Sequence, residues 1–222
     1  MSKHTPAVDV SHLHAYDTDG AIREAEHHLN RALSRRSLLR GAGVAAGGAA
    51  VAGLLPGSAL AAGFGPTDKA IMNFALTLEY LEAAFYARSL EHAGLSGSLQ
   101  HFAKVVSVHE KAHVQFLQGA LGSSAVARPS FDFGAATRSP SAFTATSIVL
   151  EDTGVQAYQG QAANLHSDAL LAAALSVHPV EARHASWIRY LAGQNPAPLA
   201  FNPALTKSQV LAAVTATGFI KA

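Results

Sequence analysis

The sequence predicts an all-α fold: a bundle of four long helices in two antiparallel hairpins, followed by a short C-terminal helix. Apolar residues after about residue 62 recur at the spacing of a helix rather than a strand. Glycine, proline and serine residues divide this part of the chain into four long segments. Short turns separate the segments within each pair and a long connection separates the pairs, so one crossover joins two hairpins.

The first hairpin is predicted from the residues at its helix ends. Its first helix begins at Thr67, after Pro66, and stops at Gly94, which suits a helix C-terminus. Its second helix begins at Ser98, whose hydroxyl suits an N-cap, and ends near Gly122. Because only a few residues join these helices, they are expected to lie side by side and antiparallel.

The second hairpin follows a connection over residues 123–138. Its helices are predicted over residues 140–164 and 167–191. Pro179 is expected to kink or divide the last of them, because proline lacks the N–H that a helix interior needs. An amphipathic segment over residues 206–216 predicts a short helix against the bundle.

Residues 1–61 differ from the rest of the chain and are predicted to be a leader. Adjacent Arg35 and Arg36 precede an uncharged stretch over residues 41–55 and the small-residue triplet at 59–61. This pattern resembles a twin-arginine export signal, which implies the twin-arginine export machinery as a partner. The protein is then expected outside the cytoplasmic membrane, in the periplasm, the cell envelope or the extracellular space. The helical domain is expected over residues 62–222, with the bundle at about 66–193 and an appendage at 194–222.

An uncleaved membrane anchor is the alternative for the uncharged segment, since residues 41–65 carry no charge. A bilayer-spanning helix needs about 20 predominantly apolar residues. The segment is instead rich in glycine and broken by Pro56, so no stable membrane span is expected in the mature chain.

Composition excludes several classes of function. The 222 residues include 16 Lys and Arg against 15 Asp and Glu, a net charge of +1, which is not the basic balance of a nucleic-acid-binding protein. The chain has no cysteine, so disulfide scaffolds, thiolate zinc sites and iron–sulfur clusters are excluded. No nucleic-acid partner is expected, and any chemistry must use Glu, Asp, His, Ser or Tyr.

Four glutamates near the centres of the predicted helices form a repeat. Only six glutamates occur after residue 61, and burying a carboxylate among apolar neighbours is costly unless a cation compensates it. Glu79 precedes Glu110 by 31 residues, and Glu151 precedes Glu181 by 30. Because the midpoints of these intervals fall in the predicted turns, the four carboxylates are expected at one level of the bundle.

A histidine follows the second glutamate of each pair after one helical turn: His113 after Glu110, and His184 after Glu181. Residues three apart share a helix face, so each Glu-x-x-His pair can bind one metal ion. Mixed carboxylate and imidazole ligation suits iron or manganese. The predicted ligands are Glu79, Glu110, His113, Glu151, Glu181 and His184, with Glu82 as an alternative to Glu79.

These motifs resemble the ferritin-like superfamily over Pro66 to Gly193. Within it, the exported ferritin-like domain family, which includes desiccation-related proteins, is closer than the cage ferritins, because of the Phe131-Asp132-Phe133 crossover and the C-terminal appendage. The resemblance implies a ferritin-like bundle with two iron ions, or manganese, and with oxygen or peroxide as the oxidant. It is carried by the motifs at residues 78–86, 110–113, 151–154 and 181–187.

The resemblance also implies a role for each residue. It implies terminal ligands at Glu79 and Glu151, bridging carboxylates at Glu110 and Glu181, and imidazole ligands at His113 and His184. Tyr86 and Tyr158 are the candidate catalytic residues, as hydrogen-bond donors near the metals or as one-electron relays, with a purely packed role as the alternative. His109 is expected to pack beside the site rather than to bind metal.

The function that this implies is Fe(II) oxidation or the consumption of peroxide or oxygen by a di-iron oxidoreductase of the ferroxidase or peroxidase type. The alternatives are a stress- or desiccation-associated ferritin-like protein without turnover and an enzyme similar to dimanganese catalases. An intact ligand set argues against a degenerate site. A homo-oligomeric assembly is left open by the sequence.

Overall fold

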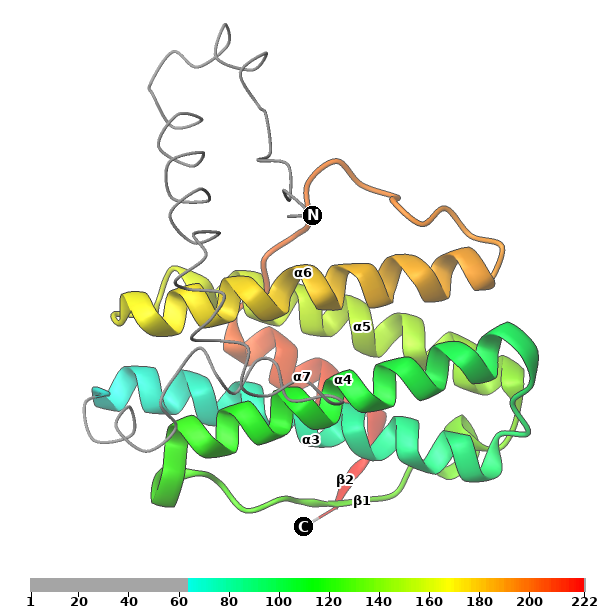
Figure 1. Cartoon of the computed structure of the whole chain (residues 1–222), viewed down its shortest axis with the longest axis horizontal. Coiled ribbons are helices and arrows are strands. Elements are labelled where there is room, and N and C mark those ends of the chain that lie inside the picture. Colours follow the sequence, from blue (N-terminus) through cyan, green and yellow to red (C-terminus); the bar gives the residue numbers. More distant parts are fainter. Residues whose placement is uncertain (1–63, 222) are drawn as a thin grey trace, which may run out of the picture. The chain divides into compact units, whose positions relative to one another are not determined.

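The computed structural model describes residues 64–221, and the predicted leader with its export signal lies outside them. Four long helices make up the bundle (Figure 1). They are α3 (Pro66–His92), α4 (Gly97–Leu121), α5 (Pro140–Ala162) and α6 (Asp168–Leu191). Helix α3 packs along α4 and α5 packs along α6, so the prediction of an all-α bundle of two hairpins is confirmed. None of the helices in this part of the chain is long and apolar enough to cross a membrane.

The helix ends follow the local sequence closely. Pro140 stands at the start of α5, where the Ser139 hydroxyl accepts a hydrogen bond from the backbone N–H of Ala142. The second helix differs from the prediction, because it begins at Gly97 rather than after Ser98. Ser96 has an extended backbone and its carbonyl already accepts from the N–H of Gln100, so the first helical turn starts two residues earlier.

Helix α6 continues through Pro179, and the expectation that the proline would divide it is wrong. A proline removes one hydrogen bond to the carbonyl four residues earlier, which here belongs to Leu175. Both residues are exposed, so water can solvate that carbonyl without cost to the core.

Two apolar clusters fill the bundle on either side of its middle. One is rich in aromatic residues and includes Phe85, Phe102 and Phe143, which are fully buried. The other includes Leu76 and Leu121. Glutamates occupy the level between the clusters, where a bundle of this size would ordinarily continue its apolar core.

The chain after α6 packs back onto the bundle. Helix α7 (Lys207–Thr217) buries Val210 and Val214 against the aromatic cluster. Just before α7 the chain crosses α5 so closely that a Cβ atom on Gly160 would lie 1.9 Å from the carbonyl oxygen of Leu205. The crossover between the hairpins includes β1 (Ser130–Phe131), which pairs antiparallel with β2 (Ile220–Lys221). This strand pair was not predicted.

Candidate metal centre

Each of the four bundle helices contributes one buried glutamate to the middle of the bundle. Glu79 on α3 is 1% exposed, and Glu110 on α4, Glu151 on α5 and Glu181 on α6 are completely buried. Apolar side chains one turn away on each helix fix the face that points inward, so the carboxylates point into the bundle. The predicted common level of the four carboxylates is observed.

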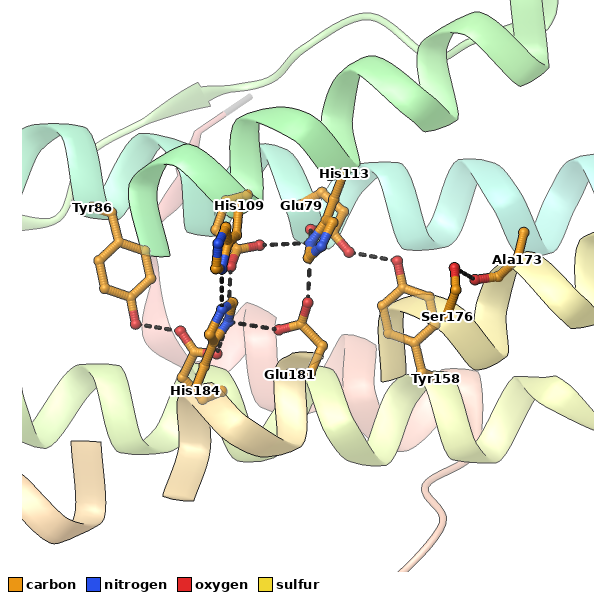
Figure 2. Close-up of polar contacts among 11 residues, drawn as sticks. Glu79, Tyr86, His109, His113, Tyr158, Ala173, Ser176, Glu181 and His184 are labelled. Atoms are coloured by element: carbon orange, nitrogen blue, oxygen red, sulfur yellow. Dashed lines mark hydrogen bonds and ion pairs between the residues drawn. The ribbon is translucent and has the colours of Figure 1, made fainter. Parts of the chain in front are cut away.

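The first ligand cluster surrounds the Nδ1 atom of His113. This atom lies 3.2 Å from Glu79 Oε2, 3.3 Å from Glu110 Oε2 and 3.1 Å from Glu181 Oε1. The four residues each offer one ligand atom, and these atoms all lie within 4.8 Å of one another. Figure 2 shows His113 between Glu79 and Glu181.

The second ligand cluster surrounds the Nδ1 atom of His184. This atom lies 3.2 Å from Glu110 Oε1, 3.2 Å from Glu151 Oε2 and 3.6 Å from Glu181 Oε2. Its four ligand atoms also lie within 4.8 Å of one another. The two clusters therefore have the same composition, three carboxylate oxygens and one imidazole nitrogen.

Glu110 and Glu181 belong to both clusters, with a different oxygen in each. Glu110 turns Oε2 toward His113 and Oε1 toward His184, whereas Glu181 turns Oε1 toward His113 and Oε2 toward His184. A carboxylate that offers its two oxygens to two neighbouring positions is the arrangement of a bridging ligand. Glu79 and Glu151 each serve a single cluster, which is the position of a terminal ligand.

The charge balance of this region favours bound cations. Within residues 64–221, the four carboxylates form ion pairs with His113 and His184 and with no lysine or arginine. Burial, and then the charge of Glu181, raises the pKa of Glu110 well above its ordinary value. Burial likewise raises the pKa of Glu151 to about 7, although His184 opposes the shift.

The pKa values of the two histidines are also raised, but by their carboxylate neighbours and against the effect of burial. Burial alone would lower the pKa of His184, but its contacts with Glu110, Glu151 and Glu181 raise it to about 12. Burial alone would raise the pKa of Glu181, but His113 and His184 lower it to about 2. The protein without metal must therefore hold protons on imidazoles that a metal ion would need in their neutral form.

Several ligand atoms of the second cluster are buried without a hydrogen-bond partner. Glu110 Oε1, Glu151 Oε2, Glu181 Oε2 and His184 Nδ1 are all buried without a hydrogen-bond partner. Such atoms are rare in folded proteins. Within residues 64–221 nine buried side-chain atoms lack a hydrogen-bond partner, and every residue of the second cluster contributes at least one of them. A single cation at the centre of this cluster would satisfy its unpartnered ligand atoms. The mixed oxygen and nitrogen donors fit iron or manganese.

The two tyrosines contact the terminal carboxylates across the hairpins. Tyr158 Oη on α5 donates a hydrogen bond of 2.5 Å to Glu79 Oε1 on α3. Tyr86 Oη on α3 donates to Glu151 Oε1 on α5. Burial raises the pKa of both phenols, which keeps them protonated as donors. Figure 2 shows the two tyrosines on opposite sides of the centre. Sequence spacing indicated that they lie near the site, but not that each would hold the carboxylate of the other hairpin.

Glu82, the alternative to Glu79, is buried but belongs to neither cluster. Its carboxylate lies toward α5, where a Cβ atom on Gly154 would be 3.4 Å from Glu82 Oε1. Burial, reinforced by the surrounding carboxylates, raises its pKa well above the ordinary value. Between these two residues the geometry favours Glu79 as the ligand.

His109 packs beside the centre. Its Nδ1 lies 2.9 Å from His184 Nε2, and the two rings are stacked with their centroids 5.1 Å apart. The contact engages the ring nitrogen of His184 that points away from the carboxylates. It was not predicted, because His109 and His184 are 75 residues apart on α4 and α6.

Fold and site together define a helical-bundle protein with two adjacent clusters of buried carboxylate and imidazole side chains that could each hold a metal ion. The model of the ferritin-like domain family matches residues 67–194, more than half of the chain. The chain therefore belongs to the ferritin-like domain family. A comparison with curated proteins found no match.

Proposed function

We propose that the protein binds two metal ions, with iron as the preferred metal, and oxidises Fe(II) with oxygen or peroxide. The observation that carries this proposal is the shared use of Glu110 and Glu181, whose two oxygens serve both ligand clusters. A purely structural role would require only that buried charges be paired. It would not require two clusters of identical composition joined by two carboxylates.

The protein's own contribution is to hold ligands, orient them and keep their protons in place. When bound, two Fe(II) ions would supply one electron each, which with two protons reduces dioxygen to hydrogen peroxide, or hydrogen peroxide to two molecules of water. Tyr158 occupies Glu79 Oε1 and so leaves Oε2 for the first cluster. Tyr86 does the same for Glu151, leaving Oε2 for the second cluster.

His109 supports the second cluster from outside. A hydrogen bond at the outer ring nitrogen of a ligating histidine fixes its tautomer and its orientation. The contact between His109 Nδ1 and His184 Nε2 does this for His184, whose Nδ1 then faces the carboxylates. His109, like the two tyrosines, acts here as a positioning residue.

We propose that this reaction occurs outside the cytoplasmic membrane, because an export signal is predicted in residues 1–61. The relationship to desiccation-related proteins belongs to the same proposal and rests on the crossover and the C-terminal appendage. Replacing Arg35 and Arg36 together by lysine should retain the protein in the cytoplasm of its host. Cell fractionation and N-terminal sequencing of the mature chain check this location. If the unmodified protein stays unprocessed in the cytoplasm of its host, the proposed export is wrong.

Metal content and single-turnover kinetics test the proposed activity. The protein purified from its native host should contain close to two iron or manganese atoms per chain after desalting. Anaerobic Fe(II) loading followed by stopped-flow mixing with oxygen or peroxide should give an absorbance change at two equivalents. Glu181→Gln should abolish that change, whereas Glu91→Gln, at an exposed position of α3, should preserve it. Failure of the unmodified chain to bind metal would overturn the proposal.

A further inference from the structure

An apolar pocket lies between all four bundle helices, next to the first ligand cluster. Its volume is about 40 Å³. Among the described residues that line it, Tyr158 and Gln161 are the only ones with polar side chains. The remaining lining residues are aliphatic or aromatic, so no charged group faces this space.

The pocket adjoins the first cluster on every helix. Ala75 precedes Glu79 by one turn on α3, Phe116 follows His113 by one turn on α4, and Val177 precedes Glu181 by one turn on α6. Residues three or four apart share a helix face, so these side chains lie on the same faces as the ligands. The fourth wall is Tyr158 of α5, the same residue that donates to Glu79.

The other side of the centre is closed. Tyr86, which matches Tyr158 in the duplicated pattern, is completely buried against Phe85, Phe102 and Phe143, with ring centroids 5.4 to 5.9 Å apart. Small residues such as Ala157, Ala173 and Ala174 line the pocket on the Tyr158 side instead. In Figure 2 Ala173 lies beyond Tyr158, on the side of the centre away from Tyr86. The two halves of the fold thus differ in packing where their ligands are alike.

The size and lining of the pocket select its occupant. A space of this volume has room for about one or two molecules the size of water, and apolar cavities stay dry and take up small apolar molecules such as xenon. Hydrogen peroxide and hydrated Fe(II) are polar and would lose hydrogen bonds there, which costs free energy. Dioxygen is small, apolar and neutral, so it loses little on entry.

We propose that this pocket binds dioxygen and delivers it to the metal centre past Tyr158. The inference rests on the proposed function and narrows its oxidant to dioxygen. The ring of Tyr158 separates the pocket from Glu79, so gas that leaves the pocket toward the centre passes this side chain. Peroxide, if it reacts, reaches the metals by another route.

Xenon provides a readout of the pocket that does not depend on metal or turnover. Crystals of the full chain under xenon pressure should show a xenon atom between Leu78, Phe116 and Val177. Ala174→Leu places a larger side chain in the pocket and should remove this atom. Ala172→Leu, at an exposed position two residues earlier on α6, is the matched control and should retain it. A pocket without xenon in the unmodified protein would overturn the proposal.

Oxidation kinetics then link the pocket to the centre. With both proteins loaded with Fe(II), Ala174→Leu should lower the second-order rate constant for dioxygen by about threefold or more relative to Ala172→Leu. The rate with peroxide should stay unchanged. An unchanged dioxygen rate, or an equal loss with both oxidants, contradicts delivery through the pocket. A chain that binds xenon but no iron overturns the proposed function and delivery with it, whereas a chain that binds iron but no xenon overturns only the pocket.

Discussion

Replacing Glu110 by glutamine should stabilise the metal-free protein, although it removes a central residue of the site. Glu110 is completely buried, and burial together with the charge of Glu181 raises its pKa well above the ordinary 4.5. In the folded protein this carboxyl therefore keeps its proton to a higher pH than it does in the unfolded chain. Since one pKa unit is worth about 1.4 kcal/mol, a raised pKa of this carboxyl can cost up to about 3 kcal/mol of stability at pH 7. Glutamine is neutral and avoids this cost.

The expected gain is up to about 3 kcal/mol at pH 7, or roughly 10 °C in Tm for a domain of this size. The gain should vanish near pH 4.5, where the unfolded carboxyl is itself half protonated. With Fe(II) or Mn(II) bound, we expect the unmodified protein to be more stable than Glu110→Gln. The unmodified protein should gain stability on binding metal, and Glu110→Gln should gain much less, because its amide keeps only one of the two oxygens that Glu110 offers to the two clusters.

Thermal unfolding followed by circular dichroism measures this, with chelator or with anaerobic metal, at pH 5 and pH 7. Glu91→Gln, at a side chain that is 68% exposed, is the control and should leave Tm unchanged in all four conditions. A metal-free Glu110→Gln protein that is less stable than the unmodified one at pH 7 would refute the reasoning. So would a gain of equal size at both pH values.

Three further predictions concern the same fold. The metal-free protein should be most stable at about pH 5. Above that pH the free energy of unfolding should fall, because the pKa of Glu151 is raised to about 7 and that of His184 to about 12, so the folded state binds more protons than the unfolded chain. Below that pH it should also fall, because the pKa of Glu181 is lowered to about 2, so the unfolded chain binds a proton at this residue before the folded state does. Urea titrations across the pH range check the fall in stability on both sides of this maximum. A stability that rises from pH 5 to 8 contradicts the expected fall above the maximum. Tyr158→Phe should weaken Mn(II) binding at one of the two positions by about tenfold, since a hydrogen bond to a charged group is worth about 1.5–3 kcal/mol. Electron paramagnetic resonance titration measures this, and an unchanged affinity would mean that the phenol does not orient Glu79. Gly160→Ala should displace the segment around Leu205 and cost about 1–3 kcal/mol, whereas Gly119→Ala, with open space around it, should cost nothing. Limited proteolysis of residues 194–206 reports the displacement, and equal protease resistance of the two variants would exclude it.

The helices were predictable because their signals are local. Ser139-Pro140 and Ser167-Asp168 mark helix starts through interactions within four residues, and the structure has α5 and α6 begin there. The start of α4 was missed because Ser96 and Ser98 offer similar side chains, and the backbone at Gly97 decides between them. The pairing of β1 with β2 joins residues 91 positions apart with only two residues in each strand, too few to leave a periodic pattern.

The level of the carboxylates was also predictable, because equal distances from a turn place residues at equal height on antiparallel helices. Contacts between the hairpins were not. The hydrogen bonds of Tyr86 to Glu151 and of Tyr158 to Glu79 depend on how one hairpin sits against the other, which no spacing within a hairpin specifies. The same holds for His109 and for the difference in packing between the two sides of the centre.

The shared carboxylates have a consequence for how the protein assembles. The first ligand cluster takes Glu79, Glu110 and His113 from one hairpin and only Glu181 from the other, and the second cluster reverses this division. Neither hairpin alone can complete an ion-binding set, yet each holds three quarters of one. A metal ion bound at either cluster would therefore link the two hairpins, and each hairpin carries the same pattern of two glutamates and one histidine.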